Sequence, residues 1–526
     1  MSSYTQVEHK GGLYELTESA LLELKSSKYF NEDLAPTSVS QRTWTTYNIT
    51  ALWISMAICI PSFTMASSLV GLGLSPWMAV FNVTLGNLIV LVPMQLNSHA
   101  GTKYGIPFPV FARLTFGSVG AHIPSLSRAL VACGWNSIQS WIGGGAVMAF
   151  IGVFAKKFLD MKDVSIFGAD VDPAHLIGFI VFLLIVLFFS TRGAEGIKVL
   201  QTIGAPILVI LSVALLIWST LLATGAGFSV GDILQASGDS SIVNNNGGFL
   251  FVFCGGLTAN IAFWATLALN IPDFSRYAKS QQAQFRGQLY GMPTAMFACA
   301  FIGAYFAQST YLAQGVAEFD PTRVLGQIDN AVVIIVSSLS LMIITVTTTI
   351  AANVVAPSNA FSNLAPGKIT FNIGVIVTVI LSILYRPWWI FGGAGAYIFG
   401  WLGTYGTILA PIAAIFIADY YIVKKRSIDV ISLFKGADGR YWYQGGFNVR
   451  AIIAWVCAFA LPIIDQFTAI GGDQTTGLFG GWISANGYIF SFIVGLAVYW
   501  VIMKGEKKSF LTEAEHTALT DKASGN

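Results

Sequence analysis

The chain has 526 residues, of which 55% are apolar and only 10% are charged, and its formal net charge is +2. Soluble domains carry about 25% charged residues, so this chain cannot cover its surface against water, and lipid is its expected solvent. The near balance of positive and negative charge excludes a protein that binds nucleic acid through a broad basic surface.

The first 47 residues are polar and contain repeated acidic side chains. A secretory signal would need an early apolar run, and a transit peptide would be poor in acids, so neither fits. We therefore predict a cytoplasmic N-terminal tail over residues 1–47, with membrane insertion driven by the first apolar helix itself.

Twelve later stretches are apolar over about 20 residues, the length that crosses a bilayer as a helix. They are 48–72, 76–98, 121–150, 174–191, 196–223, 248–271, 288–313, 331–356, 370–386, 395–423, 449–468 and 483–503. The run 395–423 is long enough for two helices, but no charged linker divides it, so we interpret it as one helix bent at Pro411. Residues 99–117 are too few and too charged to span, which predicts a surface helix or a re-entrant segment.

Basic residues gather in the loops on the side of the N-terminus, most densely at Lys424, Lys425 and Arg426, whereas the opposite loops hold few. An even number of spans places the C-terminal tail, 504–526, on that same side. The positive-inside bias then predicts a multi-pass protein of the cell membrane with both termini in the cytoplasm.

Two predicted spans carry residues that disturb a helix. Pro61 lies in the middle of ALWISMAICIPSF, where it removes a backbone hydrogen bond and crowds the preceding turn. The sixth span holds Gly255, Gly256 and Asn260 in CGGLTANIAFWATLALN. Interruptions at corresponding places of two five-helix halves indicate an inverted-repeat transporter with its binding site at the breaks. The alternative is that the proline and the glycines only bend and pack the helices.

Charged residues are sparse inside the predicted spans. We find no Asp, Glu, Lys, Arg or His near the middle of a span, and Asp273, Asp329, Asp419 and Asp465 fall at helix ends. We therefore expect an uncharged cavity, which argues against a proton pump built on a buried carboxylate and against a strongly charged substrate. A membrane enzyme would need a catalytic acid, base or metal at that depth, so we predict no enzyme and no cofactor.

Aromatic rings and carboxamides occupy mid-depth positions instead. Trp135 and Gln139 are four residues apart in CGWNSIQSWIGGG and share one helix face. Trp264 lies in the sixth span and Asn353 in the eighth. Two indole faces can hold a flat ring, and a carboxamide offers a donor beside an acceptor, which matches the edge of a nucleobase or a cyclic ureide. The alternative is that each tryptophan packs in the core and each amide bonds a neighbouring helix.

The run Thr347, Thr348 and Thr349 also lies at mid-depth, in the eighth span. A lone hydroxyl there usually bonds its own helix, but three in succession cannot all face lipid comfortably. Hydroxyl oxygens together with carbonyls freed by the break in the first span would suit Na⁺. Because no carboxylate lies nearby, the pattern favours Na⁺ over H⁺.

Six stretches of the chain carry a resemblance to known proteins. They are NEDLAPTSVSQRTW, KYGIPFPVFAR, GWNSIQSWIGG, LTANIAFWATLALNIPDFSRYAKSQ, AANVVAPSNA and ADYYIVKKR. These resemble the nucleobase:cation symporter-1 family, in the same order along the chain. The resemblance implies an all-α integral membrane protein of the LeuT-type fold with 12 transmembrane helices. Its 5+5 inverted repeats would cover 48–223 and 248–423, followed by two extra helices in 449–503.

The resemblance also implies the residues that bind substrate and ion. The substrate residues are Trp135, Gln139, Phe263, Trp264 and Asn353, with Cys59 at a first-helix position near the ligand. The Na⁺ ligands are the carbonyls of Ser55, Ile58 and Ile344 and the hydroxyls of Thr347 and Thr348. The hydantoin-transporting branch has glutamine in place of Cys59. The plant plastid members, which carry uracil and purine bases, tend to have glutamate in place of Gln139.

We therefore predict a symporter that imports a neutral planar nucleobase, uracil or a purine, with Na⁺ by alternating access, and H⁺ is the alternative ion. An allantoin or hydantoin permease of the same family is the alternative function. The expected partners are a nucleobase or cyclic ureide and membrane lipid, without nucleic acid, and we expect a monomer.

Overall fold

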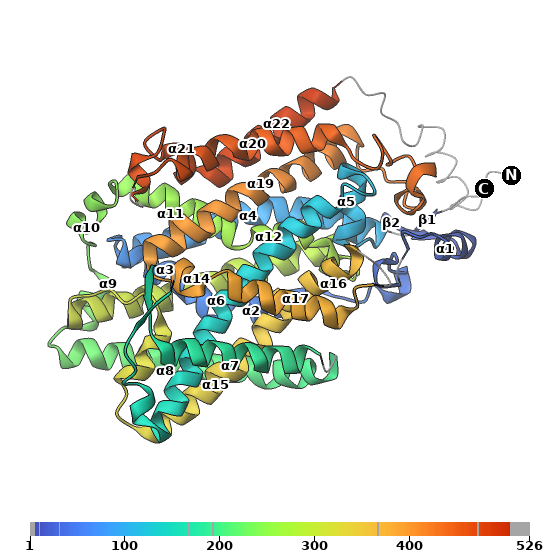
Figure 1. Ribbon diagram of the computed structural model, residues 1–526. Coiled ribbons are helices and arrows are strands. Elements are labelled where there is room, and N and C mark those ends of the chain that lie inside the picture. The colour runs from blue at the N-terminus through green and yellow to red at the C-terminus, as the bar shows by residue number, and fades with distance from the viewer. Residues whose placement is uncertain are drawn as a thin grey trace.

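The computed structural model describes residues 6–9, 11–30, 32–166, 168–191, 194–364, 368–470 and 473–504. The strands among these residues form two small antiparallel hairpins: β1 (Gln6–His9) with β2 (Leu13–Leu16), and β3 (Val164–Ile166) with β4 (Ala169–Val171). Figure 1 shows most of the long helices running in roughly one direction, with β1, β2 and α1 (Glu18–Lys25) at one end. The prediction of an all-α fold is confirmed.

Each of the twelve predicted apolar stretches coincides with a helix or with a run of helices. In chain order these are α2 (Thr46–Ala57) with α3 (Ile60–Gly71), α4 (Pro76–Tyr104), α6 (His122–Phe154), α7 (Pro173–Ser190), α8 (Ala194–Gly225), α11 (Phe249–Phe263) with α12 (Ala265–Asn270), α14 (Gln281–Gln314), α15 (Ala331–Thr349) with the π-helical η5 (Ile350–Val354) and α16 (Val355–Leu364), α17 (Phe371–Leu384), the π-helical η6 (Ala396–Leu402) with α19 (Gly403–Ile417) and the π-helical η7 (Ala418–Val423), α20 (Val449–Phe467), and α22 (Gly487–Met503).

Shorter helices connect these elements. They are α5 (Phe108–Phe116), α9 (Val230–Leu234), α10 (Ser240–Asn245), α13 (Pro272–Ser275), α18 (Pro387–Ile390), α21 (Trp482–Ala485), and the 3₁₀ turns η1 (Glu32–Leu34), η2 (Val39–Gln41), η3 (Lys156–Phe158), η4 (Pro321–Gln327), η8 (Ile431–Phe434), η9 (Gly436–Asp438) and η10 (Gln474–Thr476).

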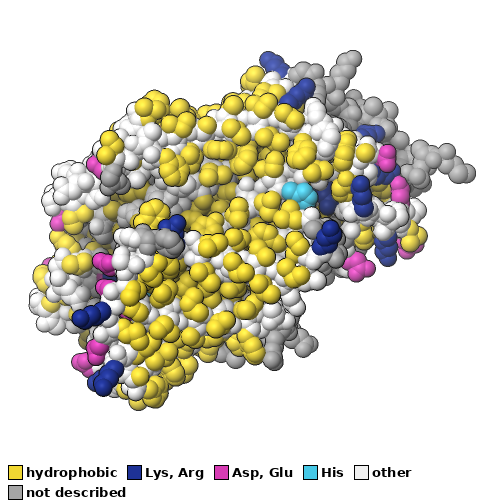
Figure 2. Space-filling view, viewed as in Figure 1, with side chains coloured by type: hydrophobic (Ala, Val, Ile, Leu, Met, Phe, Trp, Pro, Cys, Tyr) yellow, Lys and Arg dark blue, Asp and Glu magenta, His cyan; other side chains and the backbone are white. Residues whose placement is uncertain are grey.

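Many helices of this bundle have the length and apolar composition of membrane spans. By length and composition, 7 helices in the described part of the chain can cross a membrane, or 8 if the bent pair α2 and α3 is one span. Four further apolar segments are shorter, namely Val209–Gly225, which is part of α8, and the helices Phe249–Phe263, Phe371–Leu384 and Gly487–Met503. Figure 2 shows apolar side chains across the middle of one face and charged side chains gathered toward its two ends. The count of twelve spans stays a prediction.

The first span is interrupted, as predicted. Helix α2 ends at Ala57 and α3 begins at Ile60, and the two are bent by 57°. Ile58 and Cys59 between them have extended backbones. Pro61 is the second residue of α3, where a missing N–H costs little because the first helical N–H groups have no partner in the helix. The break therefore lies just before the proline.

The sixth span is interrupted too, but not at the glycines. Gly255, Gly256 and Asn260 all lie inside α11, and the helix breaks at Trp264, between α11 and α12. A Cβ added at Gly255 would lie 2.1 Å from the Phe399 ring, so this glycine allows close helix packing. For these glycines the packing alternative is correct, and the break was predicted about one turn or more too early.

Residues 99–117 differ from the predicted surface helix. Helix α4 continues to Tyr104, and the short helix α5 that follows is almost wholly buried. Burial of its charged residue is possible because Arg113 donates to the Leu433 carbonyl at 3.3 Å and lies over the Phe434 ring at 5.1 Å. The surface interpretation is wrong, and the re-entrant interpretation stays a prediction.

Candidate functional site

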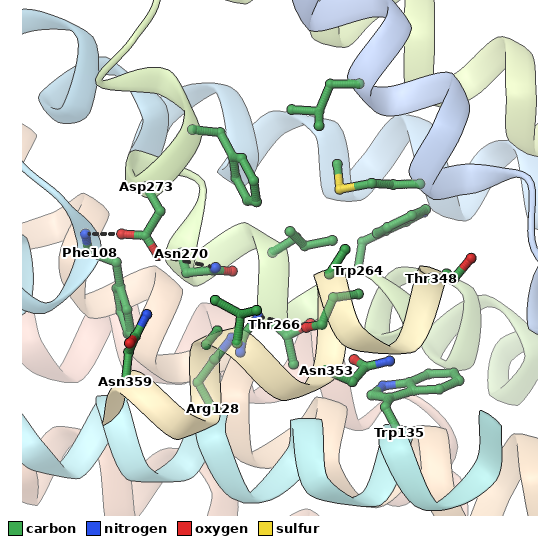
Figure 3. Close-up of a pocket in the computed structure, with 18 of the residues that line it drawn as sticks. Phe108, Arg128, Trp135, Trp264, Thr266, Asn270, Asp273, Thr348, Asn353 and Asn359 are labelled. Carbon is green, nitrogen blue, oxygen red and sulfur yellow. Dashed lines mark hydrogen bonds between the residues drawn. The ribbon is translucent and has the colours of Figure 1, made fainter. Parts of the chain in front are cut away.

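One cavity of about 1280 Å³ lies where the two broken spans meet the third and eighth spans. All eleven residues predicted for substrate and ion line it, namely Ser55, Ile58, Cys59, Trp135, Gln139, Phe263, Trp264, Ile344, Thr347, Thr348 and Asn353. Figure 3 shows Trp135, Trp264, Thr348 and Asn353 around one part of this space. The sequence therefore predicted residues that the fold does bring together.

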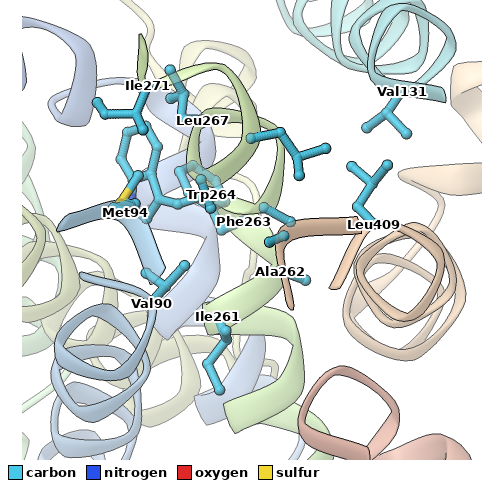
Figure 4. Packing of buried hydrophobic residues seen from close by; sticks show 14 of the residues in the cluster. Val90, Met94, Val131, Ile261, Ala262, Phe263, Trp264, Leu267, Ile271 and Leu409 are labelled. Carbon is cyan, nitrogen blue, oxygen red and sulfur yellow. The ribbon is translucent and has the colours of Figure 1, made fainter. Parts of the chain in front are cut away.

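The two indoles are arranged about Phe263. The Trp135 ring lies 5.2 Å from the Phe263 ring at an interplanar angle of 78°, and the Trp264 ring lies 5.0 Å from it at 84°. Both are edge-to-face contacts, which favour a fixed mutual geometry. Figure 4 shows Phe263 and Trp264 packed with Val90 and Met94 of α4. In this structure Phe263 contacts both indoles, so it belongs to the aromatic wall between them.

Hydrogen bonds outside the cavity orient both indoles. Trp264 donates from Nε1 to Asn87 Oδ1 at 2.7 Å, and Asn87 is held in turn by its own bond to the Val83 carbonyl at 2.7 Å. Trp135 donates from Nε1 to the Tyr405 hydroxyl at 3.3 Å, and that hydroxyl donates to the Ala262 carbonyl at 2.9 Å.

The tethering residues Asn87 and Tyr405 were missed by the sequence analysis. Asn87 gave a signal, since it is a carboxamide in the middle of the second span. Tyr405 gave little, because tyrosine recurs along the tenth span. Asn87 joins the second span to the sixth, which carries Trp264. Tyr405 joins the tenth span to the third, which carries Trp135, and to the sixth.

The two carboxamides line the cavity and have no hydrogen-bond partner among the described residues. Gln139 is only 5% exposed, and its Oε1 has no hydrogen-bond partner among the described residues. Asn353 is 7% exposed and lies in the π-helical turn η5, a type of turn often found at functional sites. The described residues contain no hydrogen bond to the Asn353 amide either. The alternative of ordinary interhelical bonds is therefore not supported for these two amides.

The predicted ion ligands meet at the same cavity from two sides. The Thr347 hydroxyl donates to the Ile343 carbonyl at 2.7 Å and the Thr348 hydroxyl donates to the Ile344 carbonyl at 3.0 Å. Each hydroxyl oxygen thereby keeps lone pairs for another partner. Opposite them, the extended backbone after α2 leaves the last carbonyls of that helix without helical partners. The Ile344 carbonyl is already an acceptor, which distinguishes it from the other predicted ligands.

Thr349 does not join this group. Its hydroxyl donates to Asn136 Oδ1 at 2.8 Å, and Asn136 donates to the Ser382 hydroxyl at 2.9 Å. This buried network ties α15 to α6 and α17. The third hydroxyl of the run is therefore a structural contact between helices.

The cavity is not uncharged along its whole length, which corrects the expectation from the sequence. Arg128, Asp273 and Arg276 also line it. Asp273 accepts from the Phe108 N–H at 2.7 Å and so caps α5, and burial raises the pKa of this carboxyl. The missed signal was Arg128, which lies within the third predicted span.

Comparison with known proteins bears directly on this arrangement. The family model for permeases of cytosine and purines, uracil, thiamine and allantoin matches residues 36–495. The purine-uracil permease NCS1 of Arabidopsis thaliana is 39% identical over 494 residues, which cover 93% of this chain and 80% of that protein. The allantoin permease of Bacillus subtilis (strain 168) is 32% identical over 447 residues, covering 85% and 89% respectively.

Solved structures agree on the architecture. The inward-facing conformation of Mhp1 superimposes with a TM-score of 0.74 at 21% identity, over 93% of this chain and 97% of Mhp1. A Na⁺-coupled sialic acid symporter gives a TM-score of 0.57 at 11% identity, over 89% and 92%. At these identities the likeness shows the fold alone, which is the LeuT-type transporter fold that the sequence resemblance implied.

Proposed function

Since the chain belongs to the nucleobase:cation symporter-1 family of nucleobase and allantoin permeases, we propose that it imports a neutral planar nucleobase, uracil or a purine, together with Na⁺. It is a multi-pass membrane transporter and not an enzyme.

A single observation carries the substrate proposal. Trp135, Trp264, Gln139 and Asn353 line one cavity, and their two carboxamides have no described partner there. The indoles supply flat apolar faces and the amides supply paired donors and acceptors, so together they suit a ring with an N–H and C=O edge. The 39% identical relative is named for purines and uracil, which favours those bases.

Allantoin is the second candidate substrate. The 32% identical relative from Bacillus subtilis is named an allantoin permease, and the N–H and C=O edge of a cyclic ureide would suit the same two amides. A bulky hydantoin is less well supported, because Cys59 offers no carboxamide where the hydantoin-transporting branch has a glutamine.

For the ion we propose Na⁺ bound between α2 and α15, with the Thr347 and Thr348 hydroxyls and the carbonyls of Ser55, Ile58 and Ile344 as ligands. Neutral oxygens are suited to a hard monovalent cation, and none of the proposed ligands is a carboxylate that could carry a proton. Because such an ion bridges the broken first span and the eighth span, its binding and substrate binding are linked and must strengthen one another equally.

We also propose the conformational state of the transporter in this structure and its orientation in the membrane. The cavity reaches Leu34 and Trp44 of the N-terminal segment, whereas Tyr397 and Trp401 pack edge-to-face on Trp135 from the tenth span. We assign the open end to the cytoplasm, with both termini there, so that this structure is inward-open. We propose that the two inverted repeats, 48–223 and 248–423, move relative to one another about the cavity.

Uptake into proteoliposomes tests the assignment. Purified protein should accumulate radiolabelled uracil or adenine when Na⁺ is higher outside, and should not when K⁺ replaces Na⁺. Unlabelled allantoin as a competitor separates the two substrate classes. Equal uptake with and without a gradient of Na⁺ or H⁺ would contradict a symporter.

A further inference from the structure

Arg128 is a buried cation that the described part of the chain leaves partly unpaired. It lies on α6, is 5% exposed and lines the cavity. Its Nη2 donates to the Ala352 carbonyl at 3.3 Å, whereas Nε and Nη1 have no partner among the described residues. Figure 3 shows the side chain reaching from α6 into the part of the cavity that also holds Thr266 and Asn270.

A guanidinium cannot escape burial by losing its proton, because it stays charged at any physiological pH. An unpaired buried charge is costly, so a buried arginine requires an anion or a full set of acceptors. No carboxylate of the described residues lies within 4.0 Å of Arg128.

Asp273, the acidic residue of the cavity lining, is already engaged. It accepts from the Phe108 N–H at 2.7 Å and from Asn270 at 3.3 Å. Arg276 adds a second positive charge to the lining. Asp273 therefore acts on Arg128 only across a distance, and an anion in the cavity could supply the direct acceptor that Nε and Nη1 lack among the described residues.

We propose that Arg128 forms an anion-binding subsite in this cavity, which takes either a carboxylate carried on the transported ring or a free inorganic anion. The Ala352 carbonyl immediately precedes Asn353, so the guanidinium lies beside the residue assigned to the edge of the ring. A carboxylate on that ring could accept two parallel N–H bonds from the guanidinium. The ring-borne case rests on the proposed function, whereas the free-anion case does not.

The test uses the purified full chain in detergent. Binding of uracil and of orotate, which is the uracil ring with a carboxylate, is measured by competition and by the shift of the unfolding temperature. Sodium chloride and sodium gluconate are compared at equal Na⁺. The variants are Arg128→Gln and Arg128→Lys. Ser125→Ala is the matched control, because Ser125 lines the same cavity and its hydroxyl bonds only its own helix, to the Ala121 carbonyl at 2.8 Å.

We expect orotate affinity to fall at least tenfold in Arg128→Gln, to recover in part in Arg128→Lys and to stay unchanged in Ser125→Ala. Uracil affinity should change less than threefold in all three variants. Stabilisation by chloride that is lost in Arg128→Gln, without an orotate effect, would assign the subsite to a free anion.

The proposal is overturned if neither orotate nor chloride distinguishes wild type from Arg128→Gln. If that variant fails to fold, the absence of any orotate or chloride effect on the wild type overturns it instead. A persisting chloride effect without binding of uracil or allantoin would reject the proposed function and leave the Arg128 subsite standing.

Discussion

Replacing Tyr405 with phenylalanine removes one hydroxyl and, with it, two hydrogen bonds at the cavity. The hydroxyl accepts from Trp135 Nε1 at 3.3 Å and donates to the Ala262 carbonyl at 2.9 Å, and the residue is 4% exposed. A bond between transmembrane helices is worth about 0.6 kcal/mol on average and up to about 1.7 kcal/mol. Loss of the pair therefore amounts to about 1–2 kcal/mol, or about 5–30-fold in an equilibrium constant.

The effect should appear in substrate affinity, because the lost bonds fix the indole that forms one wall for the ring. We expect Tyr405→Phe to raise the KM for uptake about 5–30-fold, with a smaller change in the maximal rate. Tyr397→Phe is the control, since the Tyr397 hydroxyl is also buried but reaches the Pro61 carbonyl only at 3.5 Å. Its KM should change less than about twofold. Equal changes in the two variants would refute the reasoning.

Three further predictions follow from the same geometry. Asn87→Leu leaves the Trp264 N–H buried without its acceptor, so substrate affinity in equilibrium binding should fall about 5–30-fold, and unchanged affinity would argue against a fixed indole. Thr348→Val should abolish the Na⁺ dependence of uptake while Thr348→Ser keeps it, whereas Na⁺-driven uptake by the valine variant would remove this hydroxyl from the ion site. Gly303→Ala places a Cβ 2.0 Å from a carbonyl of α3 and should lower the unfolding temperature, whereas Gly400→Ala meets open space and should not; equal temperatures would contradict the packing.

The positions of the helices and the residues that line the cavity could be predicted because their signals are local. Apolar length identifies membrane helices, and a tryptophan or carboxamide at mid-depth is conspicuous in any single span. Pro61 likewise marks the first break, because a proline is tolerated in the first turn of a helix and disfavoured in its interior. Each of these features can be recognised in the sequence without knowing which helices are neighbours.

The features that were mispredicted or missed depend on neighbouring helices. Gly255 looks like a helix breaker, yet it is a contact point for Phe399 inside a continuous helix. Asn87 and Tyr405 acquire their roles only through the indoles that reach them from other spans. Arg128 was visible as a charged residue within the third predicted span, but its place in the cavity follows from helix packing that the sequence does not show.

Equilibrium binding of radiolabelled uracil to the purified protein tests the central claim, that two indoles and two amides recognise a flat ring in this cavity. The account predicts saturable binding that Na⁺ strengthens, and at least a tenfold loss of affinity in Asn353→Leu. Asn359→Leu, which changes the same residue type elsewhere in the cavity lining, should bind as wild type does. Unaltered binding of uracil and allantoin in Asn353→Leu and Trp264→Leu, with both proteins folded, would contradict the account.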